Sequence, residues 1–546
     1  MRTASRFGLT LGAALSAALL SSAGALAAGT SATVHDSATA GRLSPSTPVT
    51  LAPQLAAPVL LARGARRIPR TPATGAAVAA APVAAATPLA GGSASLLANF
   101  NGVSSRDSAL ANFGAEFEPP DQGLCAGNGF VLEMVNAAYT VYDTKGKPLA
   151  GPFNINGPFN EGLTEFSSDP RCYYDAAHNT WIATILQIGK GETTSSLDIA
   201  VNNSGDPRTV WTAYRINTTG LGGASGPKDP ECPCFGDQPT LGIDAHNLYV
   251  TTNEFSINGS RYNGAQIYAI AKQELEALGS SVSFVHFNKL NIGGAPAASV
   301  QPALTSGAPV AEYFLSALDP HATFDQRIGV WALSEPGAVA RGEIPKLSSL
   351  VVSSEAYGVP PRAEQKGSAS LIDAGDDRMQ QTQFIGGSIW GQLTTAITIP
   401  GDPLQRAGAA WFQVKASLTE GVLSTARIQR QGYLAVPGNY VVYPAIQVTS
   451  AGTAAMVLGI SGRTRHPSAA YSTLAPGAAA FGPVAVAAAG VRPYDPEGER
   501  WGDYSFAVLD PSATSVWMAT EYVPPKPSQT EDGRGNWGTR VFQLSP

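Results

Sequence analysis

Hydrophobic and polar residues alternate with a period of two along most of the chain after residue 96. Such alternation, bounded by Gly, Asp, Asn and Pro, predicts β-strands. A helical pattern occurs only in "YAIAKQELEAL" (268–278) and in "KLSSLV" (346–351). The chain is therefore predicted to be all-β, with its clearest strands at 129–143, 179–188, 247–255, 312–318, 388–399, 453–461 and 515–522.

Two distant segments share one pattern, "CFGDQPTLGIDAHNLYVTTNEF" (234–255) and "RWGDYSFAVLDPSATSVWMATEY" (500–522). Strand pairs of this kind recur about every 45 to 75 residues. Four-stranded units at such intervals indicate a β-propeller, whereas a β-sandwich would show turns about every 8–12 residues without the long repeat. We expect six or seven blades, and the seven copies favour seven; they lie near 121–142, 169–188, 237–255, 301–318, 376–399, 443–460 and 503–522.

The N-terminal part of the chain has a different composition. Arg2 and Arg6, the apolar "LTLGAALSAALL" and the small-residue site at 25–27 predict a secretory signal peptide over 1–27. The apolar stretch is short for a membrane span. Residues 28–95 are dominated by Ala, Pro, Thr, Ser and Gly and are predicted to form a disordered spacer. The propeller domain is expected over 96–546, in a protein that is secreted or held in the cell envelope, with a periplasmic location open.

Composition narrows the range of partners. The chain carries a formal net charge of −6, with 14% charged and 44% hydrophobic residues, and it has no basic cluster. Nucleic acids and anionic membranes are therefore not expected as partners, because both need concentrated Lys and Arg. We expect a monomer with no membrane span after signal cleavage.

The four cysteines are Cys125, Cys172, Cys232 and Cys234. In an exported protein they predict up to two disulfides, with three possible pairings. A four-thiolate zinc site is the alternative, but Cys-Pro-Cys lacks the spacing of zinc knuckles. Because a bridge between Cys232 and Cys234 would close a very tight ring, we expect at least one of them to pair elsewhere.

An aspartate ends a strand and opens a polar turn in three of the repeats, at Asp175, Asp244 and Asp510. Its carboxylate can accept backbone N–H groups across the turn, and the aromatic residue that follows can pack between blades. We interpret these aspartates as structural.

A second set of aspartates precedes the first strand of each pair. In a propeller that strand lines the central channel, so these residues are predicted on the rim where such folds hold ligands. Arginines and tyrosines lie near them in the sequence. The ligand-binding candidates are Asp121, Asp169, Arg171, Asp237, Asp377, Arg378, Arg500, Asp503 and Tyr504, beside Tyr173.

The predicted rim has two interpretations. In one, the aspartates cap strands and pair with arginines across blades, and this is favoured because repeated positions mostly serve a repeating fold. In the other, the arginines clamp an acidic sugar or carboxylate, with Asp or Tyr within reach for chemistry. Ca²⁺ could bind such carboxylates, although the chain has no Asp-x-Asp-x-Asp loop, and no other cofactor is indicated. No catalytic residue can be assigned by motif, because zinc-protease, nucleophile-elbow, P-loop and dinucleotide signatures are all missing.

Over about 97–546 the chain resembles a group of exported bacterial β-propeller proteins, mostly uncharacterised and distantly similar to sialidase-type propellers. The resemblance implies a propeller fold and export, but no agreed activity. The chain departs from the sialidase Asp-box, because Ser is missing two residues before the Asp and the Gly is absent. The segments that carry the resemblance are "PPDQGLCAGNGFVLEMVNAAYTVYDTKG", "SDPRCYYDAAHNTWIAT", "IAVNNSGDPRTVWTAYRI", "GDQPTLGIDAHNLYVTTNEF", "GAQIYAIAKQELEAL", "DDRMQQTQFIGGSIWGQLTTAI", "RWGDYSFAVLD" and "NWGTRVFQL".

These observations together predict an exported, non-catalytic binding protein whose channel face takes a saccharide, peptide or protein ligand. A sialidase-like glycoside hydrolase or lyase acting on acidic sugars is the first alternative. A structural scaffold of an exported assembly is the second.

Overall fold

A computed structural model of the chain describes residues 31–46, 49–50, 80–90, 94–115, 117–163, 165–189, 191–222, 228–318, 324–494, 500–525 and 535–546. The predicted signal peptide at 1–27 lies outside the described residues. The prediction of an all-β chain is confirmed, because strands dominate every described part of the sequence after residue 95.

Most strands belong to four-stranded antiparallel meanders that follow one another along the chain. Meander A contains β5 (Gly123–Gly127), β6 (Phe130–Val135), β7 (Ala138–Asp143) and β8 (Pro148–Asn154). Meander B contains β9 (Phe166–Asp175), β10 (Thr180–Ile188), β11 (Ser195–Asn202) and β12 (Val210–Asn217). Meander C contains β13 (Cys234–Ile243), β14 (Asn247–Ser256), β15 (Tyr262–Ala271) and β16 (Val282–Phe287).

The later meanders have the same design. Meander D contains β19 (Gln301–Thr305), β20 (Ala311–Ala317), β21 (Asp325–Ser334) and β22 (Lys346–Tyr357). Meander E contains β23 (Gln381–Ile385), β24 (Ser388–Ile397), β25 (Arg406–Thr419) and β26 (Val422–Leu434). Meander F contains β27 (Tyr440–Val448), β28 (Ala454–Gly462), β29 (Arg465–Leu474) and β30 (Ala485–Ala488), while β31 (Phe506–Leu509), β32 (Val516–Tyr522), β33 (Gly538–Ser545) and β4 (Ser95–Ser104) make meander G.

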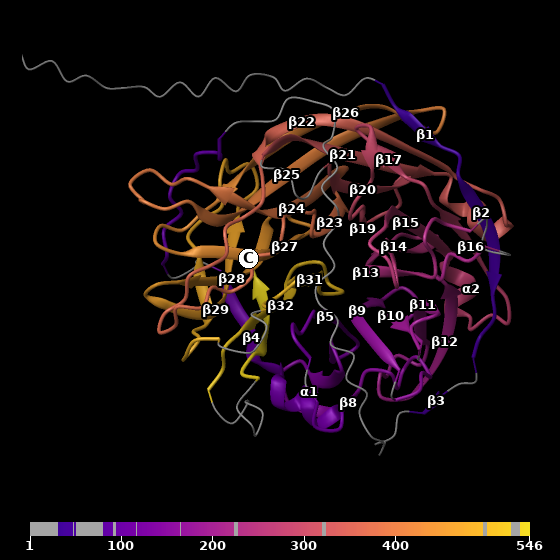
Figure 1. Ribbon diagram of the computed structural model, residues 1–546, viewed down its shortest axis with the longest axis horizontal. Helices are drawn as coiled ribbons and strands as arrows, with labels where there is room; N and C mark the ends of the chain where they lie inside the picture. The colour runs from indigo at the N-terminus through magenta and orange to yellow at the C-terminus, as the bar shows by residue number, and fades with distance from the viewer. Residues whose placement is uncertain are drawn as a thin grey trace, which may run out of the picture.

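The meanders surround a common centre, and the first strand of each lies nearest to it (Figure 1). This is a β-propeller-like arrangement, in which each sheet packs its faces against its neighbours. Apolar clusters between sheets hold the arrangement together; one contains Leu124 and Val131 of meander A with Phe506 and Trp517 of meander G. The predicted strand pairs coincide with the first two strands of meanders B to G. In meander A the strand expected over 129–143 is divided by a turn into β6 and β7, so the predicted pair at 121–142 covers three strands.

The end of the chain and an early segment close the ring. Strand β4 pairs antiparallel with β33, in a register that runs from Gly538 with Ser104 to Ser545 with Ser95. Meander G therefore takes its outermost strand from the N-terminal side of meander A. This pairing ties the two ends of the domain to one sheet.

The prediction of a disordered spacer over 28–95 is wrong for the described residues of that range. Three short strands there extend the outer edges of meanders D, C and B: β1 (Thr33–His35) pairs with β22, β2 (Ala38–Leu43) with β16, and β3 (Val49–Thr50) with β12. Further on, Val83 and Leu89 form parallel bridges to Thr398 and Val484 near meanders E and F. Small residues rich in Ala and Pro cannot build a core, but their backbone can still add to an existing sheet edge. We call residues 33–43, 49–50 and 83–89 the perimeter strands.

Helices are few and short in the described chain. Helix α2 (Lys272–Glu276) confirms the C-terminal half of the helical pattern at 268–278, whereas its first residues belong to β15. The helical interpretation of "KLSSLV" is wrong, because this segment begins β22. Helix α1 (Ser105–Ala111), the 3₁₀ helix η1 (Pro336–Arg341) and the small hairpin of β17 (Asn291–Ile292) and β18 (Ala295–Pro296) complete the elements.

The two disulfides join Cys125 to Cys172 and Cys232 to Cys234. The expectation that Cys232 or Cys234 pairs elsewhere is therefore wrong, because the Cα atoms of this pair lie 4.5 Å apart and allow the bridge directly. The first bridge links β5 to β9 and so joins meanders A and B. The second lies within one turn at the start of meander C.

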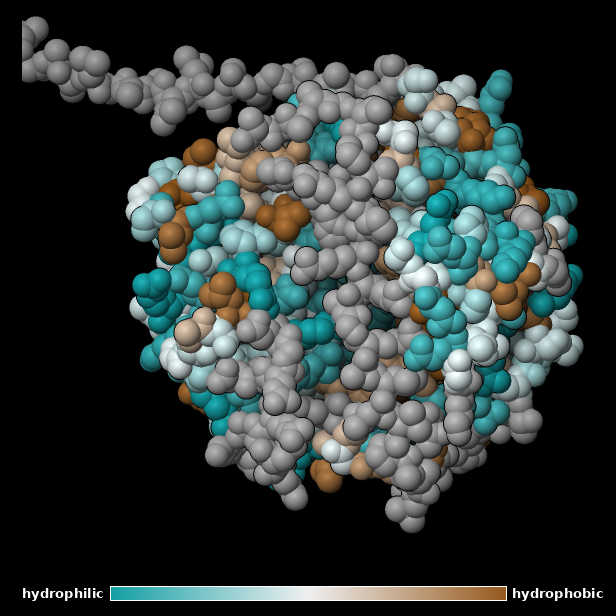
Figure 2. Space-filling model, in the orientation of Figure 1, coloured by the Kyte–Doolittle hydropathy of each residue, from teal (hydrophilic) through white to brown (hydrophobic). Residues whose placement is uncertain are grey.

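No helix among the described residues is long and apolar enough to cross a membrane. On the face shown in Figure 2, hydrophilic residues predominate and apolar residues are scattered rather than gathered in one large patch. The exposed apolar side chains come from separate elements, among them Val34, Leu149 and Val310. Scattered residues of this kind are normal on a monomer surface.

Candidate functional site

An X-Pro pair recurs in the innermost strands and shapes the end of the channel. Asp169-Pro170, Gln238-Pro239 and Tyr443-Pro444 each interrupt the pairing of the first two strands of a meander with a register shift. Proline lacks the N–H needed for the ladder, so it favours a bulge at this point. The residue before each proline has a positive φ, of 58°, 51° and 48° respectively. Bulges of this kind redirect the side chains of the strand that carries them.

Asp121 and Asp503 occupy the matching positions of meanders A and G and also have positive φ, of 48° and 88°. A non-glycine residue in this region costs about 1–3 kcal/mol and persists only where the surroundings impose it. The cluster of such residues at one end of the channel is therefore a candidate functional feature. We call Asp121, Asp169, Asp237, Asp503, Arg378 and Arg500 the carboxylate–arginine ring.

Asp121 and Asp169 are joined through an asparagine. Asn136 Nδ2 donates to Asp121 Oδ2 at 2.7 Å, and Asn136 Oδ1 accepts from the backbone N–H of Asp169 at 2.9 Å. Burial raises the pKa of Asp121 well above its usual range, and the Asp503 and Asp169 carboxylates raise it further. The ring therefore holds a carboxyl group that favours its neutral form.

Hydrogen bonds continue from one meander to the next. The backbone N–H of Gln238 donates to Asp169 Oδ2 at 3.0 Å, and Arg378 Nη1 donates to Gln238 Oε1. Arg378 also makes a bidentate pair with Asp376, at 2.7 and 2.6 Å. Hydrogen bonds of Asp169, Gln238 and Arg378 thus connect meanders B and C with the segment that precedes meander E.

Arg500 pairs with Asp503 on the approach to meander G. Their side chains are 25% and 37% exposed, so this part of the ring is open to solvent. Burial opposes the charge of Arg378 and Arg500, but the surrounding carboxylates outweigh it and raise both pKa values. Both guanidinium groups are therefore permanent cations.

Asp237 differs from the other carboxylates of the ring. It is partly exposed, and no hydrogen bond joins its carboxylate to another of the described residues. Burial and the Asp169 carboxylate raise its pKa to about 7, against the opposing effect of Arg378. Asp237 is therefore a carboxyl group of near-neutral pKa with oxygen atoms available to a ligand.

Three of the predicted rim residues lie away from this open side. Arg171 is buried, donates to the Gln122 carbonyl at 3.0 Å and stacks over Tyr504 with 3.4 Å to the ring centroid. Asp377 is fully buried, while its neighbour Asp376 pairs with Arg378. Burial raises the pKa of Tyr357 in meander D, and the Asp325 and Asp377 carboxylates raise it further. Arg171, Tyr504 and Asp377 therefore support the ring from within the protein.

Sequence reasoning missed Gln238, Asp376 and Asn136. Gln238 follows Asp237 in the repeated Gly-Asp skeleton, and Asp376 stands beside Asp377, so both were available from the same pattern. Asn136 lies in the turn between β6 and β7 and carries no recognisable motif. Only the three-dimensional closure of the ring brings it between two aspartates.

The turn aspartates have the structural role predicted for them. Asp244 Oδ1 accepts the backbone N–H groups of His246 and Asn247, both at 2.7 Å. Asp175 accepts from Ala177 at 2.9 Å and Asp510 from Ser512 at 3.0 Å in the same way. The aromatic residues that follow these turns, Trp181, Tyr249 and Trp517, are buried between sheets.

Metal-binding potential among the described residues is limited. Asp175, His178 and Glu276 bring three donor atoms together, but Lys272 Nζ already lies 2.6 Å from Asp175 Oδ2 and supplies the positive charge. Cys232 and Cys234 lie near Glu254, but their sulfurs are joined in a disulfide and offer no thiolate. No cofactor follows from these groups.

No protein-family model and no curated protein sequence matches the chain. Solved structures of β-propellers show distant similarity to it. A chain from a complex of Drosophila plexin A with semaphorin 1b is 9% identical, with 84% of this chain and 87% of that chain covered and a TM-score of 0.33. An α-L-arabinanase from Penicillium chrysogenum is 10% identical over 81% of this chain and 98% of its own, also with a TM-score of 0.33. A GH93 α-L-arabinofuranosidase from Fusarium graminearum is 11% identical, with coverage of 81% and 97% and a TM-score of 0.33.

Proposed function

We propose that the protein is an exported, non-catalytic binding protein with a seven-bladed propeller, and that a saccharide binds at the carboxylate–arginine ring. Meanders A to G are the proposed blades. The observation that carries the proposal is Asp237, a partly exposed carboxyl group with no hydrogen bond to the described chain. It interacts electrostatically with two cations, Arg378 and Arg500, and with two other carboxylates, Asp169 and Asp503.

The chemistry of the ring suits a hydroxyl-rich ligand. Carboxylate oxygens accept hydrogen bonds from sugar hydroxyls, and guanidinium groups donate to hydroxyl or carboxylate oxygens. Arg500 and Asp503 are the most exposed pair of the ring and can exchange their mutual contact for a ligand. An uncharged or weakly acidic sugar fits better than a strongly acidic one, because both arginines already have carboxylate partners, Asp376 and Asp503.

Export is supported by the cysteines. Disulfides persist in oxidising compartments, and the chain pairs all four of its cysteines. The proposal places the protein outside the cytoplasm, either secreted or in the cell envelope.

A thermal-shift screen on the full chain tests the proposal, with a glycan array to supply candidate sugars and with and without Ca²⁺. We expect a saccharide to raise the melting temperature of the wild type, and Asp237→Asn to lose most of that shift. Asp206→Asn is the matched control, because Asp206 pairs with Arg208 between β11 and β12 and does not belong to the ring. A shift that survives both Asp237→Asn and Arg500→Ala would contradict the proposed site.

Glycosidic bond hydrolysis is a second candidate, favoured by one observation. A carboxyl group with a pKa of about 7, Asp237, lies within electrostatic reach of Asp503, which is paired with Arg500. A neutral acid beside an ionised carboxylate is the arrangement that glycosidases use. Release of reducing sugar from a stabilising saccharide, lost in Asp237→Asn, would replace the binding proposal with this one.

The scaffold alternative gives a different result in the same screen. Arg378 and Arg500 already have carboxylate partners, as a purely structural ring requires. If no sugar and no Ca²⁺ shifts the melting temperature while Asp503→Ala lowers it, the ring is structural.

A further inference from the structure

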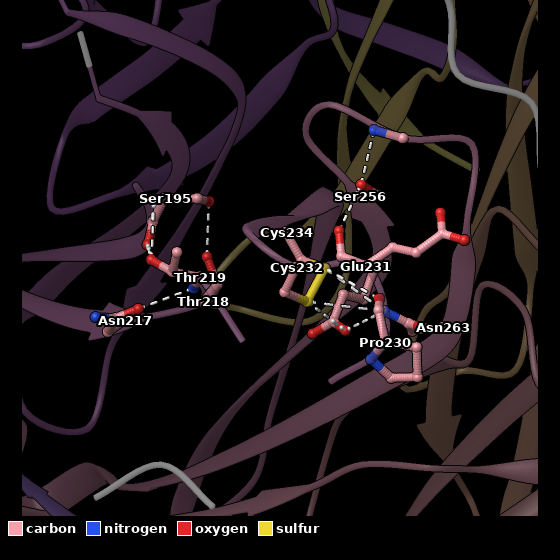
Figure 3. Close-up of a disulfide and its surroundings, with 12 residues drawn as sticks. Ser195, Asn217, Thr218, Thr219, Pro230, Glu231, Cys232, Cys234, Ser256 and Asn263 are labelled. Carbon is pink, nitrogen blue, oxygen red and sulfur yellow. Dashed lines mark hydrogen bonds between the residues drawn. A yellow bond between two sulfur atoms is a disulfide. The ribbon is translucent and has the colours of Figure 1, made fainter. Parts of the chain in front are cut away.

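The Cys232–Cys234 disulfide lies beside a buried carboxyl group at the start of meander C, next to the strand β13 that also carries Asp237. Figure 3 shows the bridge with the Asn263 side chain next to it. Asn263 Nδ2 lies 3.5 Å from Cys234 Sγ and donates to Glu254 Oε1 at 2.9 Å. Cys232 Sγ lies 4.0 Å from the same Glu254 oxygen. One amide therefore holds a carboxyl group against both sulfurs.

The two disulfides of the chain differ in what they can contribute to stability. Cys125 and Cys172 are separated by 47 residues and join two sheets, whereas Cys232 and Cys234 are separated by 2. A disulfide restricts the unfolded chain more as the loop it closes grows longer. The small ring at Cys232–Cys234 is therefore poorly suited to a stabilising role.

We propose that Cys232–Cys234 is a thiol-exchanging disulfide, reduced by small thiols, and that Glu254 donates the proton to the departing sulfur. The proposal is independent of saccharide binding. Cys232 is the sulfur open to attack, because it is 6% exposed while Cys234 is 0% exposed. A small thiol can reach a sulfur of this exposure more readily than a protein thiol can.

The exchange balances in two steps. The thiolate of a small thiol forms a bond to Cys232 Sγ, the bond between Cys232 and Cys234 breaks, and its electron pair goes to Cys234 Sγ. Asn263 stabilises that thiolate by hydrogen bonding, and the Glu254 carboxyl protonates it from within 4.8 Å. A second thiolate then attacks the small-thiol sulfur of the mixed disulfide, and Cys232 leaves and takes a proton from water. Two small thiols are oxidised to their disulfide as one protein disulfide is reduced.

Burial gives Glu254 the protonation state that this step needs. Burial and the nearby Asp229 carboxylate together raise the pKa of Glu254 to about 8, against the opposing effect of the hydrogen bond from Asn263. The other titratable groups around it are Tyr262 and Tyr268, neutral at pH 7, and His286, whose pKa burial lowers to about 4. Glu254 is therefore the acid of this cluster at neutral pH.

A small cavity supplies the route by which Glu254 regains its proton. Its volume is about 30 Å³, room for about two water molecules, and Asp229, Glu254 and His286 line it. Gly220 also lines it and approaches the bridge closely, since a Cβ at this position would lie 2.6 Å from Cys232 Sγ. The absence of a side chain at position 220 leaves room for the Cys232 sulfur beside a residue that lines the cavity.

Reduction of the full-length protein by glutathione tests the proposal. The thiols that form are trapped by alkylation and assigned by mass spectrometry, at pH values from 6 to 9. Each reduction rate is divided by the fraction of glutathione present as thiolate, which gives a corrected rate. We expect Cys232–Cys234 to open while Cys125–Cys172 stays closed. The corrected rate should fall above a pH of about 8, as Glu254 loses its proton.

Two variants isolate the role of Glu254. Glu254→Gln places an amide of similar size where the neutral acid stands. It should lower the corrected rate at pH 7 on the order of tenfold or more. It should also remove the decrease in the corrected rate above a pH of about 8. Asp229→Asn should move the fall to lower pH, because it removes a charge that raises the pKa of Glu254. Glu231→Gln is the control, since Glu231 is exposed and adjacent to Cys232 in sequence.

The proposal is overturned if Cys232–Cys234 opens only when the protein unfolds. It is equally overturned if folded Glu254→Gln is reduced with the wild-type rate and pH profile. A Glu254→Gln protein that does not fold would leave the decision to Asp229→Asn, where an unmoved pH profile contradicts the role of Glu254.

Discussion

At the scale of single residues, the carboxylate–arginine ring crowds like charges. Asp237 gains a proton more easily in the fold than in the unfolded chain, because its pKa rises from 3.8 to about 7. The protonated Asp237 carboxyl group therefore contributes to the free energy of unfolding. This contribution is fully present below pH 4 and is lost as the pH rises through 7. If the ionised Asp237 carboxylate is kept for ligand binding, it lowers the stability of the ligand-free protein.

Asp237→Asn should therefore raise the melting temperature relative to the wild type at pH 8, by about 1–2 °C after allowance for solvent screening. The difference should shrink toward zero at pH 4, where the wild-type carboxyl group is neutral. Differential scanning calorimetry across this pH range checks the prediction. A variant that is less stable than the wild type at every pH would mean that Asp237 serves the fold.

Residue chemistry was only partly predictable from the sequence. The recurrence of an aspartate before the first strand of each predicted pair identified Asp121, Asp169, Asp237 and Asp503, because a repeating fold repeats its positions. It gave no sign that Asp377 turns inward while Asp376 pairs with Arg378, since adjacent residues of an irregular segment can point either way. The burial that raises the pKa of Asp237 depends on the neighbouring sheets, so it cannot be predicted from the sequence of meander C alone.

At the scale of elements, period-two alternation located the first two strands of meanders B to G, whereas in meander A it merged β6 and β7 into one strand at 129–143. It failed for "KLSSLV", where spacing of apolar residues alone does not separate a helix from a strand in so short a run. It also failed for the perimeter strands, because an added edge strand is held by backbone hydrogen bonds and needs no apolar pattern. The sequence analysis did not expect Cys232 to pair with Cys234, because the bridge closes a very small ring. The backbone around Pro233 nevertheless brings the two cysteines together.

The Cys125–Cys172 bridge joins two sheets and should stabilise the fold. For a loop of 47 residues, the entropy removed from the unfolded chain corresponds to about 4 kcal/mol. The double variant Cys125→Ala/Cys172→Ala should lower the melting temperature clearly. Cys232→Ala/Cys234→Ala is the control and should change it much less; equal losses in the two variants would contradict this assignment.

At the scale of the whole molecule, segments before residue 105 hold the ring in two different ways. Strand β4 supplies an entire edge of meander G, with most of its residues paired to β33. The perimeter strands instead add a fifth strand, or a single bridge, to sheets that are already complete. Loss of β4 exposes the long edge of β33 and opens the ring, whereas loss of the perimeter strands leaves every four-stranded sheet intact.

Two N-terminal truncations separate these roles. A chain that begins at Ser95 should fold, with a modest decrease in melting temperature, because β4 remains and the outer edges of meanders B, C and D become free. A chain that begins at Ser105 should fail to form a cooperative fold, since meander G loses its outer strand and the apolar contacts of Phe100 with Tyr142 and Trp517. Circular dichroism melting and size-exclusion chromatography of both chains check this. Equal stability of the two truncated chains would show that meander G does not depend on β4 and that closure of the ring lies elsewhere.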